Sequence, residues 1–197
     1  MTYIKTNIKQ PGIVELLFYK GPTGKALSNL AQTLLHGPST LSSGERELIA
    51  SHVSALNNCE YCYESHSASA TAHLHDNGNA ASCMRTDPEK AAVSDKMKSL
   101  LKIAGLVQKS GREVTAAHIE TAKKVGATDE EIHDTVLIAA AFCMYNRYVD
   151  GLGTNLPAKK EDYLPMGERM AKVGYLYPPL FLRKYVIRKM NKDGKRQ

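Results

Sequence analysis

Apolar residues recur along this chain at the spacing of helix faces, and this feature most restricts the possible fold. Leu48, Ile49 and Val53 form one such apolar stripe. The stripe follows Ser42 and Glu45, which have the spacing of a capping box at a helix start. No segment alternates apolar and polar residues between tight glycine turns, as a half-buried strand would. We therefore expect an all-α protein.

The same criteria predict a compact bundle of about seven or eight helices. The expected segments are residues 24–36, 42–56, 59–74, 87–109, 114–125, 128–141, 161–173 and 179–191. Residues 26–56 and 116–143 share one order of features: a helix, a glycine break, a capping box and an apolar helix. Two related helical-hairpin halves would explain this order, and so would the general sequence preferences of helix ends.

The chain of 197 residues is expected to form one domain over residues 1–182, followed by a basic tail over residues 183–197. Seven Lys and Arg and one Asp in the tail account for the whole net charge of +6. A basic tail can bind nucleic acid or anionic lipid, but no recognition motif accompanies this one. We therefore predict a solvated tail, with no nucleic acid and no membrane among the partners.

The start of the chain lacks the basic and then apolar layout of a signal peptide. A run of about 18 apolar residues, which a transmembrane helix needs, is also absent from the sequence. These two observations predict a cytoplasmic protein. Four cysteines are too few for a disulfide scaffold. In a reducing compartment, a close pair of cysteines indicates redox or metal chemistry.

Cys59 and Cys62 form a C-x-x-C pair, and His66 follows four residues after the second cysteine. Two thiols at this spacing can close a disulfide across one helical turn. If the pair opens a helix, the helix dipole and free N–H groups lower the pKa of a thiol there. The spacing of Cys62 and His66 places both on one helix face, where the imidazole can take the thiol proton.

Glu47 lies on a polar stripe with Ser51, Ser54 and Asn58, which ends beside Cys59. The stripe can line a polar pocket next to the thiols, with Glu47 as a proton acceptor for His66 or Cys62. Spacing alone favours the other interpretation, in which the stripe faces solvent.

Residues 48–66, with Glu47 before them, resemble the motif of alkylhydroperoxidase D-like proteins of the carboxymuconolactone decarboxylase superfamily. The family pattern is a Glu twelve residues before a C-x-x-C pair and a His four residues after it. The matching positions are Glu47, Cys59, Cys62 and His66. Residues 146–152 also resemble a segment of the peroxidase-related branch, so the resemblance spans about residues 35–155.

The resemblance implies an all-helical homo-oligomer, a trimer or hexamer, that reduces hydroperoxides with thiols. We expect no cofactor and no metal. It further implies that Cys62 attacks the peroxide and that Cys59 resolves the sulfenic acid into a disulfide. An external dithiol, such as dihydrolipoamide or a thioredoxin-like protein, would then reduce the disulfide. The best-known members carry a second His where this chain has Tyr61, which is a poor proton shuttle near pH 7. We therefore expect a shorter relay and weaker peroxidase activity.

Three other interpretations stay open at this stage. Zinc could be bound by Cys59, Cys62, His66 and either His73 or His75, although the spacing differs from that of common zinc fingers. A redox-sensing helical module would use the same cysteines slowly. A decarboxylase of the same superfamily is the third interpretation, and the C-x-x-C pair argues against it.

Overall fold

The computed structural model describes residues 2–6 and 8–193. These residues form ten α-helices and three short 3₁₀ turns, with no strand among them, so the all-α prediction is confirmed. The helices are α1 (Ile13–Tyr19), α2 (Gly21–His36), α3 (Ser43–Leu56), α4 (Glu60–Leu74), α5 (Asn79–Thr86), α6 (Asp95–Lys109), α7 (Ala116–Lys124), α8 (Asp129–Gly151), α9 (Tyr163–Val173) and α10 (Leu180–Asp193). The 3₁₀ turns are Pro88–Lys90, Gly111–Glu113 and Lys160–Asp162.

Two short helices exceed the predicted number. The first, α1, precedes the first expected helix, and α5 lies around Cys83, between the expected segments 59–74 and 87–109. The predicted segment 87–109 is also not one helix. It divides into a 3₁₀ turn and α6, whose start is fixed by the Ser94 hydroxyl accepting a hydrogen bond from the Met97 N–H.

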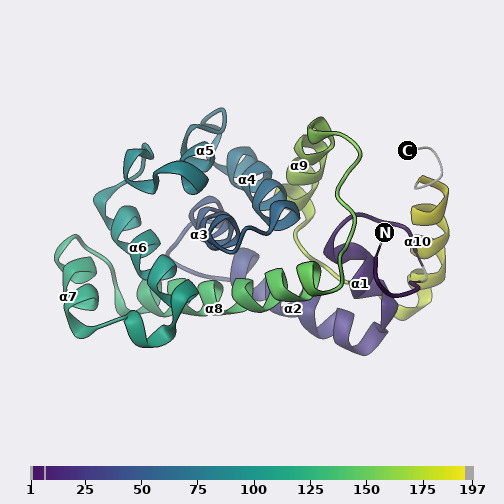
Figure 1. Ribbon diagram of the computed structural model, residues 1–197, viewed down its shortest axis with the longest axis horizontal. Helices are drawn as coiled ribbons and strands as arrows, with labels where there is room; N and C mark the ends of the chain where they lie inside the picture. The colour runs from purple at the N-terminus through teal and green to yellow at the C-terminus, as the bar shows by residue number, and fades with distance from the viewer. Residues whose placement is uncertain (1, 7, 194–197) are drawn as a thin grey trace.

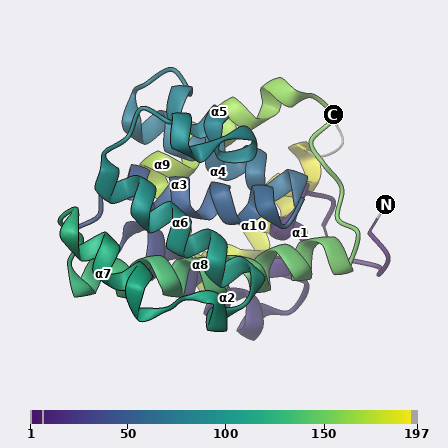
Figure 2. The ribbon, with the colours of Figure 1, turned by 60° about the vertical axis from the view of Figure 1, so that its left-hand side comes forward.

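Helix α3 lies at the centre of the molecule, with α4, α6 and α8 packed around it (Figures 1 and 2). It begins at the predicted capping box, in which Ser42 and Glu45 exchange side-chain and backbone hydrogen bonds. Every residue from Arg46 to Ala55 is buried. A helix buried on all sides must bury its polar face as well as its apolar stripe, and that polar face carries Glu47.

The turn between α3 and α4 places the cysteine pair. Asn58 adopts a left-handed conformation with φ of 56°, which Asn tolerates better than most residues. Cys59 is then the N-cap of α4, and its N–H donates to the Ser54 carbonyl at 3.0 Å. The Asn57 side chain donates to the Asn146 side chain of α8 at 2.8 Å. The Asn146 amide in turn donates to the Ser54 hydroxyl at 3.0 Å, so α8 holds the turn in position.

Helix α9 packs closely against α4, and the loop that follows it, residues 174–179, reaches the centre of the molecule. A Cβ at Gly167 would lie 2.4 Å from the backbone of Ala68, so only glycine allows this approach. Gly174 ends α9 with a φ of +68°, and the Tyr175 N–H that follows donates to the Gln32 side chain at 2.7 Å. This hydrogen bond ties the loop to α2.

Helices α1 and α10 lie at one end of the molecule, and α7 lies at the opposite end (Figure 1). Helix α10 crosses the boundary that the sequence predicted between domain and tail, and residues 194–197 of that tail lie outside the described residues. None of the helices in the described part of the chain has the length and apolar character that crossing a bilayer demands.

Candidate active site

Glu47 and His66 form a buried pair at the interface of α3 and α4. The Nδ1 atom of His66 donates to Oε2 of Glu47 at 2.6 Å, and the Glu47 side chain is inaccessible to solvent. The His66 ring meets the Phe142 ring edge to face, with 4.6 Å between centroids. Ser51 and Ser54 are also buried, so the interpretation of the stripe as solvent-facing is wrong for these residues, and only Asn58 at its end is exposed.

Tyr175 contacts the same pair from the loop between α9 and α10. Its hydroxyl donates to Oε1 of Glu47 at 2.5 Å, and its ring stacks on His66 with 5.9 Å between centroids. Burial and the negative charge of Glu47 raise the pKa of Tyr175 well above its usual range, so the hydroxyl stays a proton donor. Sequence reasoning missed this residue. The available signal was a pair of tyrosines, Tyr175 and Tyr177, in a connection that otherwise consists of glycine, leucine and proline.

The two cysteines differ in their surroundings, although both are free thiols. Cys59 is completely buried, whereas Cys62 is buried against one wall of a cavity. A hydrogen bond with the Cys62 sulfur, together with burial, raises the pKa of Cys59 far above its ordinary value. Cys59 is therefore expected to stay a protonated thiol near neutral pH.

The cavity beside Cys62 has a volume of about 310 Å³ and mainly apolar walls. Leu27, Phe142 and Met166 contribute to these walls, and Cys62 and His66 also line the cavity. Two residues of α10, Val186 and Met190, also line the cavity, so the segment predicted as a solvated tail contributes to the site.

The residues near the end of α8 divide between two pockets. Tyr145 lines the cavity, and its hydroxyl donates to the Leu27 carbonyl at 2.8 Å. Arg147 and Asp150 instead line a different pocket with Asn57. Only Tyr145 of this group is therefore placed to contact a molecule bound beside Cys62.

Tyr61, which replaces the second His of the best-known relatives, is a packing residue with one weak polar contact. Its ring covers the backbone of Gly12, where an added Cβ would lie 2.1 Å from the ring. Its hydroxyl donates to the sulfur of Met166 at 3.7 Å. Burial and the nearby Cys62 raise the pKa of Tyr61 above its usual value, so it does not exchange protons near neutral pH.

His36 and His73 approach Glu47 from α2 and from the end of α4. Both are half-buried. Burial lowers the pKa of His36, and His73 and Arg46 lower it further while Glu47 opposes them. The neutral imidazole is therefore favoured at this position.

The structure does not assemble the zinc site that the sequence left open. Within residues 2–6 and 8–193, the metal-ligand side chains that converge in a group of three or more are His36, Glu47 and His73. Neither cysteine belongs to that group.

The model of the carboxymuconolactone decarboxylase family matches residues 22–77 and again residues 77–153. The chain belongs to this family. The two consecutive matches, together with capping boxes at the start of both α3 and α8, favour two related halves.

Solved structures of similar proteins support the same placement. A peroxidase-related protein of uncharacterised function from Ralstonia eutropha JMP134, described as an alkylhydroperoxidase AhpD core, is 26% identical. The match covers 80% of this chain and 81% of that one, with a TM-score of 0.72. Another uncharacterised peroxidase-related protein, from Silicibacter sp. TM1040, is 25% identical over 78% of both chains, with a TM-score of 0.71.

A third structure, a protein of unknown function from Agrobacterium tumefaciens, is 21% identical and supports the fold alone. That match covers 79% of this chain and 100% of the other, with a TM-score of 0.65. No curated protein matches the chain significantly. The resemblance to alkylhydroperoxidase D-like proteins of this superfamily is confirmed.

Proposed function

We propose that this protein is a thiol-dependent peroxidase that reduces organic hydroperoxides through a Cys59–Cys62 dithiol and disulfide cycle. One observation carries the proposal. Cys62 lines an apolar cavity together with His66, whose imidazole is bonded to the buried carboxylate of Glu47. A nucleophile, a base and a group that orients the base are the parts that covalent catalysis requires.

In the first step, the Cys62 sulfur attacks one oxygen of the hydroperoxide and the O–O bond breaks. The alcohol leaves, and Cys62 becomes a sulfenic acid. In the second step, the Cys59 thiol attacks the Cys62 sulfur, which forms the disulfide and releases water. An external dithiol then returns two electrons and two protons to the pair and is itself oxidised to a disulfide.

We assign the transfer of the Cys62 proton to His66, with Glu47 supporting the imidazole. Since Nδ1 of His66 is bonded to Glu47, Nε2 is the nitrogen left to take the proton of Cys62 and pass it to the leaving alkoxide. The buried carboxylate orients the ring and stabilises the imidazolium, as in other carboxylate–histidine pairs. The hydroxyl of Tyr175 holds the second carboxylate oxygen in place.

The cavity favours alkyl hydroperoxides over hydrogen peroxide. Its lining is mainly apolar, so an alkyl group gains free energy by leaving water there, about 0.8 kcal/mol for each buried CH₂. Hydrogen peroxide has no apolar part with which to gain this free energy. We also assign the protein to the cytoplasm, because its external dithiol requires a reducing compartment.

The protein is further proposed to form a homo-oligomer, a trimer or hexamer as the family resemblance implies. Leu137 and Met144 lie seven residues apart on one face of α8, and their exposed fractions are 40% and 42%. Apolar side chains exposed together on a helix face are typical of contacts between protein surfaces.

Stopped-flow mixing of the reduced protein with cumene hydroperoxide and with hydrogen peroxide tests the proposal. Cys62→Ser should abolish peroxide reduction, whereas Cys59→Ser should complete one turnover and stop at the sulfenic acid. Cys83→Ser is the matched control, because Cys83 lies in α5, outside the site, and its loss should leave the rate unchanged. The assignment of roles is wrong if Cys59→Ser, and not Cys62→Ser, removes the first turnover.

A further inference from the structure

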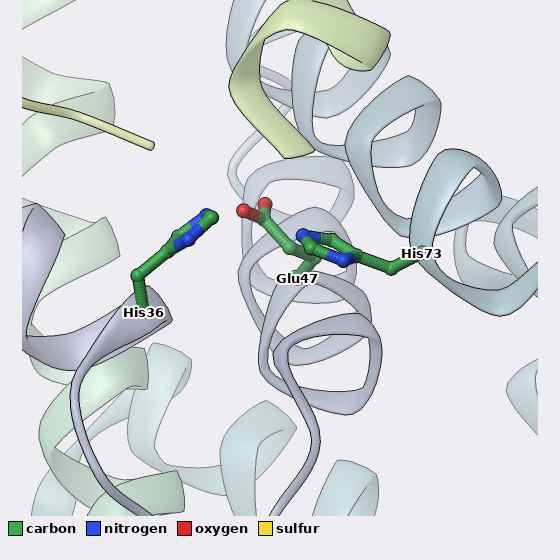
Figure 3. Close-up of side chains that lie close together, drawn as sticks. All are labelled: His36, Glu47 and His73. Carbon is green, nitrogen blue, oxygen red and sulfur yellow. The ribbon is translucent and has the colours of Figure 1, made fainter. Parts of the chain in front are cut away.

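A second group of polar side chains surrounds Glu47, separate from the residues that line the Cys62 cavity. His36 is the last residue of α2 and His73 belongs to the last turn of α4. Figure 3 shows the two imidazole rings on either side of the Glu47 carboxylate, both directed toward it. One ligand atom from each of the three residues lies within 4.8 Å of the others.

Both histidines carry a nitrogen without a protein partner. The Nε2 atoms of His36 and His73 are each buried and make no hydrogen bond. A buried polar atom left unpaired costs about 1–3 kcal/mol, so native proteins rarely keep two of them side by side. Two imidazoles that face a buried carboxylate and each keep an unpaired nitrogen point to a bound ligand that accepts lone pairs.

We propose that His36, Glu47 and His73 bind one divalent transition-metal ion, with Zn²⁺ as the best fit. Two imidazoles and one carboxylate are a ligand set that Zn²⁺ accepts, with the fourth position open to water. Mg²⁺ and Ca²⁺ fit less well because they prefer oxygen ligands throughout. Zinc–ligand bonds of about 2.0–2.1 Å bring ligand atoms to roughly 3.3 Å from one another. The three side chains therefore need to close by up to 1.5 Å, a movement within reach of the half-buried histidines.

Glu47 keeps a lone pair available for the ion. Its two oxygens already accept hydrogen bonds from His66 and Tyr175, and each carboxylate oxygen has capacity for one more partner. The ion would then bind the carboxylate that supports His66, so Zn²⁺ should slow peroxide reduction. This regulatory consequence, unlike the metal site itself, rests on the proposed function.

The metal site is tested in the full-length Cys59→Ser/Cys62→Ser protein, because thiolates would otherwise compete for Zn²⁺. Titration against a chromophoric chelator should show one equivalent of bound Zn²⁺. His36→Gln and His73→Gln should each weaken binding at least tenfold, since loss of a residue that only supports a metal ligand already costs 10–100-fold. His75→Gln is the matched control, because His75 is an exposed histidine two residues beyond His73 and should leave binding unchanged. Circular dichroism of each variant verifies that the helices are intact.

Substitution of Co²⁺ identifies the ligands. The visible spectrum should be that of tetrahedral nitrogen and oxygen coordination, without a sulfur charge-transfer band in the near ultraviolet. The metal site is refuted if both Gln variants bind Zn²⁺ as tightly as the parent, if the parent binds none, or if Co²⁺ shows sulfur ligation. Because the redox pair is absent from this protein, the result does not depend on peroxidase activity.

The regulatory consequence is tested in the protein with its cysteines intact. The Zn²⁺ concentration that halves the peroxide reaction should rise at least tenfold in His36→Gln and stay constant in His75→Gln. Zn²⁺ captured by the thiols contributes equally to both variants, so the difference between them isolates the Glu47 cluster. Equal inhibition of the two variants overturns the coupling between the metal and the relay.

Discussion

Replacing Tyr175 by Phe removes one hydrogen bond from the buried Glu47 carboxylate and keeps the aromatic ring. A hydrogen bond to a charged group contributes about 1.5–3 kcal/mol to stability. For a protein of about 200 residues, 1 kcal/mol corresponds to roughly 2–4 °C in the unfolding midpoint. We therefore predict that Tyr175→Phe lowers the midpoint by roughly 3–12 °C, while the ring continues to stack on His66.

Tyr177→Phe is the control, since Tyr177 lies in the same loop. Its hydroxyl donates to the Leu17 carbonyl at 3.5 Å, a long hydrogen bond to a neutral group. Its loss should cost less than about 1 kcal/mol. Urea unfolding of both reduced variants at pH 7, monitored by circular dichroism, measures the free energy of unfolding of each variant. The two curves should have equal m-values. If the two substitutions lower the free energy of unfolding equally, the Tyr175 hydroxyl does not stabilise the charged Glu47 carboxylate.

Three further predictions concern labelling, acid stability and assembly. Because its pKa is raised, the Cys59 thiol stays protonated as pH passes the ordinary thiol pKa of about 8.5. Iodoacetamide at pH 7–9 should therefore label Cys62 before Cys59. Equal labelling of the two in peptide maps would contradict this. Burial raises the pKa of Glu131, but hydrogen bonds from Lys96 and Thr128 outweigh it and lower the pKa. Because the pKa of Glu131 is lower in the folded state, its ionised carboxylate stabilises the protein above the unfolded-state pKa of about 4.3. This stabilisation is lost as pH falls through the folded-state pKa. Lys96→Met should therefore flatten the loss of urea stability below about pH 5, and an unchanged slope argues against it. Light scattering should give a trimer or hexamer, and a 21.6 kDa species at micromolar concentration would refute the assembly.

Helical periodicity predicted most of the fold, because a long amphipathic helix repeats apolar residues at helical spacing over several turns. The two helices it missed, α1 and α5, have seven and eight residues and no side-chain hydrogen bond at their N-caps. Helices this short offer two turns of pattern at most. The same periodicity could not decide which way the Glu47 stripe faces, because a central helix and a surface helix can share one spacing of polar residues.

The residues of the C-x-x-C motif could be predicted because they are close together in the sequence. Glu47 and His66 are 19 positions apart on adjacent helices, and their side chains form a hydrogen bond. Tyr175 lies 128 positions from Glu47 and reaches it only through the packing of α9 and the loop that follows. His36 belongs to α2 and His73 to the end of α4, and no ligand spacing in the sequence joins them to Glu47. Contacts of this kind are set by tertiary packing, which local patterns do not encode.

In the proposed cycle, a hydroperoxide oxidises Cys62 and Cys59 then closes a disulfide with it. Peptide mapping after one equivalent of cumene hydroperoxide detects this disulfide. A protease that cleaves after Glu60 separates the two cysteines, so a disulfide between them appears as two linked peptides. These linked peptides are expected, two hydrogens lighter than the reduced pair, with the Cys83 thiol intact. Sulfonic acid at both positions without a linked pair, or unreacted thiols after the peroxide is consumed, would contradict it.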